Sequence, residues 1–284
     1  MQFLEETKEN RKPKIAVLMT TYNRRESTIK CIRSLYEGNP GLDLRFVVAD
    51  DKSTDNTAFA IKALSYKKHV IDGTGKLFWT GGMRRAIAYA LMGAENLDYV
   101  LMVNDDVVFF EHSIEELVNR LEDSLAGVIV GATCDKAGKL SYGGVEKKSR
   151  FFAKFGLISP SKELVYCDTF NCNCVLIKSD VFKAAGNLDG KYTHSMADYD
   201  YGMHLNRMGY KIINSEKFVG ECEDNDIEKS WRNPKLSRLQ RIKLKEGPKG
   251  LPFGDWFYFV RKNYGIVSAI YHSITPYVRI AIGK

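Results

Sequence analysis

The sequence lacks the features that mark membrane-spanning, exported and dinucleotide-binding proteins. No run of 18 apolar residues occurs, which argues against a transmembrane helix. The segment from Met1 to Lys14 is polar and charged rather than apolar like a secretory signal, which predicts a cytoplasmic chain. Neither G-x-G-x-x-G nor a Walker-type loop is present, which argues against dinucleotide enzymes and P-loop NTPases.

The six cysteines lack the paired C-x-x-C spacing of zinc sites, even where Cys167, Cys172 and Cys174 lie close together. Because the chain is long and carries no export signal, we expect reduced thiols rather than a disulfide framework. The segment 171–177 is therefore interpreted as the entry to a strand with small buried thiols.

Composition is that of an ordinary folded protein, with 44% hydrophobic and 27% charged residues in 284. This length suits one large domain with an appendage. The formal net charge of +7 arises from 42 basic and 35 acidic side chains. Such a mild excess suits anionic small molecules or an anionic membrane surface, and it is too diffuse to indicate nucleic acid as a partner.

Short apolar runs alternate with amphipathic segments up to about residue 125, which predicts parallel strands joined by helical crossovers. The expected fold is α/β, with a mostly parallel sheet flanked by helices. Expected strands are 15–19, 44–49, 70–71, 99–103, 128–130, 172–177 and 210–213. Expected helices are 27–36, 57–65, 83–92, 113–125, 180–185 and 199–208. The glycine- and lysine-rich stretch 136–162 is expected to pass over the site as an excursion.

Acidic clusters follow two of the expected strands, where ligands bind in open α/β sheets. Asp50 and Asp51 follow the strand 44–49, and Asn104, Asp105 and Asp106 follow the strand 99–103. Two acidic strand ends indicate one crevice that recognises a polar ligand and holds a hard cation. Turn chemistry and helix capping are the structural alternatives.

Three further segments carry candidate chemistry, and each has an ordinary structural alternative. The first is Thr21-Tyr22-Asn23-Arg24, which can offer a ligand hydrogen bonds, stacking and a cation. Its structural alternative is a simple turn. Gly81 and Gly82 stand before a helix expected from Met83, where exposed N–H groups favour phosphate. Arg84 or Arg85 would add a charged contact, and Trp79 is a sugar platform or a core residue. Asp198 and Asp200 open a helix, as general base or as acids that the helix dipole favours.

Taken in order, these motifs resemble a family 2 glycosyltransferase of the GT-A fold, over about residues 14–219. The matching segments are Thr21-Tyr22-Asn23-Arg24, Asp50-Asp51-Lys52-Ser53-Thr54-Asp55, Asn104-Asp105-Asp106, and Asp198-Tyr199-Asp200 with Arg207-Met208-Gly209-Tyr210. Phe78-Trp79-Thr80-Gly81-Gly82 is similar to a stretch of bacterial rhamnosyl- and galactofuranosyltransferase-like members.

The resemblance implies inverting transfer of a sugar from a nucleotide-diphosphate donor to an acceptor hydroxyl, in bacterial surface polysaccharide assembly. It implies Asp198 as the general base and Asp106 as the ligand of a Mg²⁺ or Mn²⁺ ion, with Asp51 on the nucleobase or ribose. Trp79, Tyr199 and Asp200 are the implied acceptor or sugar contacts. The implied donor-binding residues are Thr21, Tyr22, Asn23, Arg24, Asp50, Asp51, Gly81, Gly82, Arg85, Asn104 and Asp105.

The chain departs from the family pattern at three places that concern the metal and the base. Ala197 replaces the usual Glu before the base, and Asn104 replaces the first acid of the metal motif. No histidine stands near 219–222, where many members have a further ligand, so Glu221, Glu223 or Asp224 would have to serve. A degenerate, non-catalytic nucleotide-sugar or carbohydrate-binding module is therefore the alternative. A sugar-phosphate nucleotidyltransferase ranks below it, because no glycine follows the first strand.

The expected domain boundary separates a glycosyltransferase domain, 14–225, from a basic and aromatic extension, 226–284. The extension has a basic stretch, 229–249, and two amphipathic helices expected at 253–264 and 266–282. These helices suit an interface with the inner face of the cell membrane, where a glycan or lipid-linked glycan acceptor would be held. Packing on the same chain or on a homodimer partner is the equally weighted alternative.

Overall fold

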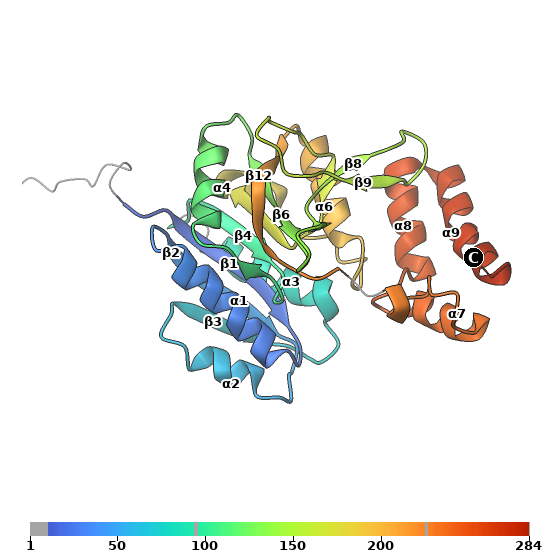
Figure 1. Ribbon diagram of the computed structural model, residues 1–284, viewed down its shortest axis with the longest axis horizontal. Coiled ribbons are helices and arrows are strands. Elements are labelled where there is room, and N and C mark those ends of the chain that lie inside the picture. The colour runs from blue at the N-terminus through green and yellow to red at the C-terminus, as the bar shows by residue number, and fades with distance from the viewer. Residues whose placement is uncertain (1–10, 94–95, 225–226, 284) are drawn as a thin grey trace, which may run out of the picture.

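The computed structural model describes residues 11–93, 96–224 and 227–283 and shows a central sheet between two helical layers (Figure 1). The main sheet runs in the order β3-β2-β1-β4-β11-β6-β12-β5, with β7 paired to β6. Its strands are β1 (Lys14–Thr21), β2 (Asp43–Asp50), β3 (Lys68–Asp72), β4 (Tyr99–Val103), β5 (Val108–Phe109), β6 (Val128–Cys134), β7 (Leu140–Tyr142), β11 (Cys174–Lys178) and β12 (Ile212–Glu221).

The first four neighbours in this order are parallel, as the sequence predicts. Strand β11 then runs antiparallel to both β4 and β6, which keeps β6 and β12 pointing the same way as β4. The expectation of a mostly parallel sheet flanked by helices is therefore confirmed. Because β1, β2 and β4 share one direction, the polar residues that follow them meet at one edge.

Helices cover both faces of the sheet, and each face has its own hydrophobic cluster. The alternation within β1 shows the division: Leu18 points into one cluster, whereas Val17 and Met19 point into the other. The helices are α1 (Arg25–Gly38), α2 (Thr57–Lys62), α3 (Phe78–Met92), α4 (Ser113–Glu122), α5 (Ser179–Ala185), α6 (Ala197–Arg207), α7 (Arg238–Glu246), α8 (Phe253–Tyr264) and α9 (Ile266–Ala281), with a short 3₁₀ turn at Ile227–Lys229.

The excursion expected at 136–162 includes β7 and most of a second, three-stranded sheet. This sheet has the order β10-β8-β9, with β8 at Gly144–Lys147, β9 at Phe155–Leu157 and β10 at Thr169–Phe170. The β8–β9 hairpin extends toward α8 and α9 (Figure 1). All six cysteines are free and buried, so the expectation of reduced thiols is confirmed.

The C-terminal segment is less separate than an appended domain. Trp256, Phe259 and Val260 of α8 and Ala269 of α9 belong to the same buried cluster as the helices α3, α5 and α6. For α8, the expected alternative of packing on the same chain therefore applies. The expected boundary at 225 and 226 lies outside the described residues. No helix in the described part of the chain combines the length and apolarity needed to cross a bilayer.

Candidate active site

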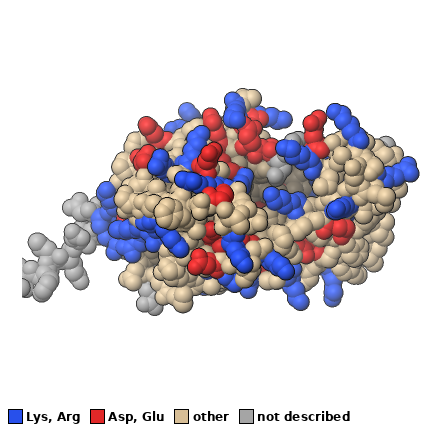
Figure 2. Space-filling model, turned by 90° about the horizontal axis from the view of Figure 1, so that it is seen from below, with Lys and Arg blue, Asp and Glu red and all other residues tan. Residues whose placement is uncertain are grey.

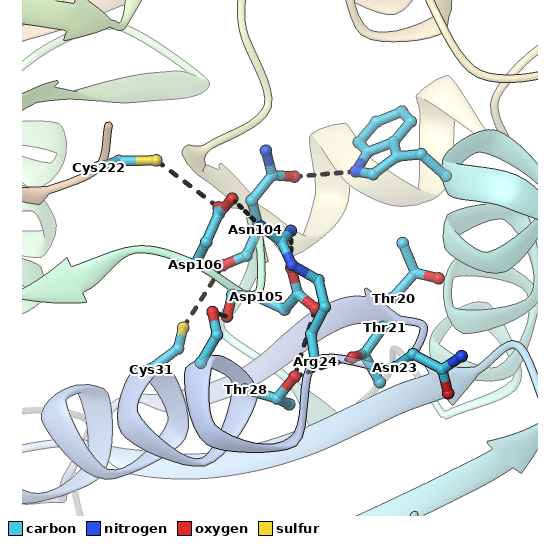
Figure 3. A network of polar contacts seen from close by, with 12 residues as sticks. Thr20, Thr21, Asn23, Arg24, Thr28, Cys31, Asn104, Asp105, Asp106 and Cys222 are labelled. Carbon is cyan, nitrogen blue, oxygen red and sulfur yellow. Dashed lines mark hydrogen bonds and ion pairs between the residues drawn. The ribbon is translucent and has the colours of Figure 1, made fainter. Parts of the chain in front are cut away.

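An arginine lies between the two acids that follow β4, at the carboxyl edge of the sheet (Figure 3). Arg24 lies between β1 and α1, and its Nη1 donates to Asp105 Oδ1 while its Nη2 donates to Asp106 Oδ2, both at 2.8 Å. The remaining Asp105 oxygen accepts from the Thr28 hydroxyl at 3.3 Å. The Thr28 hydroxyl is also 2.8 Å from that of Thr21.

Burial and charge act in opposite directions in this cluster. Burial raises the pKa of Asp105, although the Arg24 guanidinium lowers it in part. For Arg24, burial lowers the pKa, but the charges of Asp105 and Asp106 outweigh it and the net direction is upward. Asp105 is only 4% exposed and its oxygens face protein donors, so it positions Arg24. This differs from the expected direct donor contact.

Trp79 connects three segments around this edge. Its indole Nε1 donates to Asn104 Oδ1 at 2.9 Å, and its backbone N–H donates to Nδ1 of His194 at 3.3 Å. The Thr80 hydroxyl donates to the His194 carbonyl, which joins α3 to the loop before α6. Burial lowers the pKa of His194 to about 4, so its imidazole is neutral at physiological pH. Trp79 is half-buried, which leaves part of its ring accessible.

Asp198 lies in the first turn of α6, directly after Met196 and Ala197. Its Oδ2 accepts from the backbone N–H of Cys172 at 3.3 Å. The next residue, Asn173, accepts from the backbone N–H of Asn104 at 3.3 Å, which links Asp198 to the loop that carries Asp106. Burial raises the Asp198 pKa from 3.8 to about 6, against the lowering effect of its backbone hydrogen bonds. A carboxylate with this pKa is suited to accept a proton near neutral pH.

Asp51 has a structural role in this arrangement. Its Oδ1 accepts from the N–H groups of Thr74 and Gly75, and its Oδ2 accepts from those of Leu77 and Phe78, at 2.7 to 3.1 Å. Four donors occupy the lone pairs of both oxygens. The carboxylate therefore caps the start of α3 and holds the loop before it, which differs from the expected direct contact with a nucleobase or ribose.

The expectation of a phosphate-binding loop at Gly81 and Gly82 is wrong. Helix α3 begins at Phe78, so both glycines lie inside it, and the Gly81 N–H bonds to the Leu77 carbonyl. A Cβ at Gly82 would clash with the Thr20 hydroxyl, so this glycine allows α3 to approach β1 closely. Arg85 donates to the carbonyl of Asp72 at the end of β3 rather than standing free.

The remaining predicted residues divide between the edge and the interior. Tyr22 is exposed beside the edge, and the Asn23 side chain accepts from the Thr54 N–H at 2.7 Å. Asp50 is buried and accepts from the Ser53 N–H. Tyr199 packs edge-on against the Phe155 ring.

Asp200 differs most from expectation. It is only 3% exposed, and it accepts from Lys262 Nζ at 2.7 Å and from Asn263 Nδ2 at 3.2 Å, both on α8. It therefore attaches α8 to α6 and does not offer itself to an acceptor.

Sequence reasoning missed Cys222, which is the residue that follows β12. Its thiol lies 3.6 Å from Asp106 Oδ1 and accepts from Asn173 Nδ2 at 3.4 Å (Figure 3). The sequence predicts Glu221, Glu223 or Asp224 for this place, but Glu221 is exposed and Glu223 pairs with Lys136. The signal was present, since the resemblance implies a histidine near 219–222, and cysteine, like histidine, is a metal-binding residue type.

The Asp106 carboxylate is the kind of oxygen donor that Mg²⁺ or Mn²⁺ prefers. The Cys222 thiol lies beside it and donates to Asp106 Oδ1, with Sγ 3.6 Å from that oxygen. In the described residues, no three His, Cys, Asp or Glu side chains gather as a metal site. The other positions would belong to substrate oxygens and water.

Comparisons with known proteins agree with this architecture. No curated protein matches the sequence. The chain is similar in structure to a mannosyltransferase from Pyrobaculum calidifontis in complex with GDP-Man and Mn²⁺, with a TM-score of 0.56 and 15% identity over 96% of this chain and 74% of that one. It is also similar to S. aureus TarS 1–349 in complex with UDP-GlcNAc, with a TM-score of 0.57 and 15% identity over 95% and 83% of the two chains.

At this identity the structural likenesses concern the fold. The family evidence comes from the sequence, because the model of glycosyl transferase family 2 matches residues 16–179, more than half of the chain. Together with the α/β architecture at whose carboxyl edge Arg24, Asp105 and Asp106 meet, this match shows that the chain belongs to glycosyl transferase family 2.

Proposed function

We propose that this glycosyltransferase moves a sugar from a nucleoside-diphosphate donor to an acceptor hydroxyl, with inversion at the anomeric carbon. The observation that carries the proposal is the Asp198 carboxylate, which has a raised pKa and is linked through Cys172 and Asn173 to the loop of Asn104. The similar mannosyltransferase and TarS structures hold GDP-Man and UDP-GlcNAc, which supports a nucleotide-sugar donor here.

In the proposed step, Asp198 takes the proton from the acceptor hydroxyl. The acceptor oxygen forms a bond to the anomeric carbon while the bond from that carbon to the diphosphate oxygen breaks. The electron pair leaves with the nucleoside diphosphate. A single base is sufficient, because attack from the face opposite the leaving group inverts the carbon without a covalent enzyme intermediate.

The donor would lie along the edge formed by Arg24, Asn104 and Trp79. The Arg24 side chain is 47% exposed despite its two ion pairs, so its charge is available to an anionic diphosphate. Trp79 is fixed by Asn104 and His194, which makes its ring a rigid wall for the sugar. Asp51 would act on the nucleobase indirectly, by fixing the backbone of residues 74–78.

A divalent cation, Mg²⁺ or Mn²⁺, would be held by Asp106 together with the donor diphosphate and water, beside the Cys222 thiol. Bound there, such an ion would neutralise the charge that develops on the departing diphosphate. The similar mannosyltransferase structure contains Mn²⁺, which supports the same class of ion here. Asp105 would contribute indirectly, by orienting Arg24 beside Asp106.

Bacterial surface polysaccharide assembly, with a glycan or a lipid-linked glycan as acceptor, is the setting that we propose from the motif resemblance. The alternative is a non-catalytic nucleotide-sugar-binding module, because Asn104 and Ala197 replace two family acids. Ala197 is buried at the start of α6, whereas Asp198 keeps partial exposure, which favours retained catalysis.

The test is a panel of UDP-, dTDP- and GDP-sugars with Mg²⁺ or Mn²⁺. Thermal stabilisation identifies the donor, since a bound ligand raises apparent stability by mass action. Donor hydrolysis and transfer to a panel of glycan acceptors then measure catalysis. Stabilisation without any turnover would favour the binding-module alternative, and the absence of both would contradict the proposed function.

A further inference from the structure

Helix α9 buries one side and exposes large apolar side chains on the other. Its small residues, including Ser268, Ala269 and Ser273, face the interior of the chain. The opposite side is apolar at spacings of three and four residues, which places these side chains on one helix face. We call this set the outer α9 face: Ile266, Val267, Ile270, Tyr271, Ile274, Val278 and Ile282, each about half exposed or more, with Val267 at 79%.

The tip of the β8–β9 hairpin extends this apolar surface. The Phe152 ring lies 5.6 Å from the ring of Tyr271, which is itself on the outer α9 face. The Ala153 N–H donates to His272 Nε2 at 3.1 Å, which fixes the hairpin against α9. Phe151, next to Phe152, is 74% exposed. Two segments about 120 residues apart in sequence therefore form one continuous apolar surface.

Basic residues outnumber acidic ones in the segments that carry this surface and in the neighbouring helices α7 and α8. The chain contains no Asp or Glu from 256 to 284. Glu246 of α7 is engaged by Lys245 and Tyr277, and Glu146 of the hairpin by Lys148. Exposed basic residues in these segments are Arg150 and Lys154 near the hairpin tip, Arg238 and Lys243 on α7, Arg261 on α8 and Arg279 on α9. Figure 2 shows mostly uncharged surface at this end, with lysine and arginine side chains and some acidic ones near its edges.

We propose that the outer α9 face and the hairpin tip form a docking surface for an anionic membrane. Apolar side chains would enter the boundary between headgroups and acyl chains, while the surrounding cations meet anionic headgroups. Each Lys or Arg close to such a surface contributes about 1 kcal/mol. A second copy of the chain is disfavoured as occupant, because a two-fold interface would bring the same basic residues together.

This surface is connected to the helix that carries the proposed base. Lys262 and Asn263 of α8 bind Asp200 of α6, and α8 packs against α9 through the shared buried cluster. Docking would thus hold the candidate active site in a defined orientation to the bilayer, where a lipid-linked acceptor would be presented. That last consequence depends on the proposed function, whereas vesicle binding itself needs neither donor nor catalysis.

The test is flotation of the full chain with vesicles of phosphatidylcholine alone or of phosphatidylcholine and phosphatidylglycerol at 3:1. We expect binding to the anionic vesicles that falls at high salt, with little binding to the neutral ones. Val267→Asp with Ile274→Asp should reduce binding at least tenfold, and Arg279→Glu should reduce it on anionic vesicles. Leu125→Asp is the matched control, since Leu125 is fully exposed in the loop between α4 and β6.

The substituted side chains are exposed in the wild-type chain, so each variant is expected to fold. Thermal melting of each variant verifies this. No binding to anionic vesicles, or equal binding by the double variant and the Leu125→Asp control, would overturn the proposal. A dimer in light scattering that the double variant dissociates would identify the face as a homodimer interface, and would also overturn it. Neither result would alter the donor panel, so failure here is distinguishable from failure of the proposed function.

Discussion

The indole Nε1 of Trp79 donates to Asn104 Oδ1 at 2.9 Å, and this contact fixes the orientation of the asparagine amide. Because an indole N–H only donates, the carboxamide oxygen must face Trp79, and the amino group turns to the other side (Figure 3). Asn104 is thus suited to donate a hydrogen bond to an anionic donor rather than to ligate a metal. The replacement of the usual acid by Asn104 therefore puts an N–H donor at this position in place of a metal-binding carboxylate.

Asn104→Asp is therefore expected to weaken donor binding. The aspartate keeps an acceptor for Trp79 but replaces the amide donor by a negative charge facing the diphosphate. In the absence of divalent cations, the affinity for the nucleoside diphosphate should fall about tenfold or more, corresponding to about 1.4 kcal/mol. Calorimetric titration measures it, with Trp79→Phe as the control that removes the indole donor and keeps an aromatic ring. Unchanged affinity for Asn104→Asp would refute a donor role for the amide.

Asp198→Asn tests the base assignment. The asparagine amide cannot take the proton from the acceptor hydroxyl. The value of kcat should therefore fall by about 10² to 10⁴, the usual contribution of a general base. Donor binding should remain close to wild type, because Asp198 contacts Cys172 and its own helix rather than the donor edge. Steady-state rates and calorimetric titration separate the two effects. Near wild-type turnover by this variant would remove Asp198 from the mechanism.

The raised pKa of Asp198 predicts a pH dependence of both rate and stability. The carboxylate must be ionised to act as base, so kcat/KM should fall as the pH decreases through about 6. For stability the sign is opposite, since a folded-state pKa above 3.8 means that ionising Asp198 destabilises the fold as pH rises from 4 to 6. Asp198→Asn should thus gain stability relative to wild type at pH 7.5 but not at pH 3.5, by up to about 3 kcal/mol. Urea unfolding at the two pH values provides the measurement, and an equal difference at both would contradict the raised pKa of Asp198.

Binding of a thiophilic metal ion should depend on Cys222 as well as on Asp106. A thiolate favours thiophilic ions, so Cd²⁺ added to the protein should produce sulfur-to-metal charge-transfer absorbance. Burial raises the pKa of the Cys222 thiol, with Asp106 adding to the effect, so Cd²⁺ affinity should increase with pH as the proton is released more readily. Cys222→Ser should abolish the absorbance and Cys222→His should retain metal affinity.

Two further variants complete this test. Asp106→Ala should weaken metal-dependent nucleotide binding, whereas Cys167→Ser, at a buried thiol in another part of the fold, should change neither signal. Identical Cd²⁺ spectra for wild type and Cys222→Ser would exclude the thiol as a ligand.

The ion pair between Lys262 and Asp200 should stabilise the attachment of α8 to α6. Lys262→Met leaves the nearly buried Asp200 carboxylate without its cation, and the cost should be about 1–3 kcal/mol, less than for a fully buried pair because Lys262 is 31% exposed. Adding Asp200→Asn should recover part of the loss. A double-mutant cycle in urea unfolding measures the coupling energy. Coupling indistinguishable from zero would assign no stabilising role to the pair.

Elements with strong local patterns were predictable. The strands near 15–19, 44–49 and 99–103 were found from continuous apolar runs, because strands buried on both faces leave no place for polar residues. The start of α3 was missed by five residues, because two glycines disfavour a helix locally. Asp51, the residue after β2, caps that helix, and Gly82 is needed for contact with β1. Both the cap and the close approach depend on contacts with segments far away in the sequence.

Site residues divide in the same way. The sequence locally indicates that Asp106 follows the end of a strand and that Asp198 begins a helix. It does not indicate which atoms these two side chains contact. Arg24 and Cys222 reach Asp106 from positions 82 and 116 residues away. Asp51 and Asp200 match family motifs, yet their oxygens are occupied by backbone donors or by α8.

The sequence by itself determined the class of the fold, the order of its elements and the family, because these follow from periodic burial and from motifs short enough to read along the chain. Only the tertiary structure decided which polar groups are free for chemistry and which neutralise one another. It also decided that a hairpin and a distant helix present one apolar surface to solvent. Burial and pairing depend on contacts between segments far apart in sequence, and no local pattern encodes those distances.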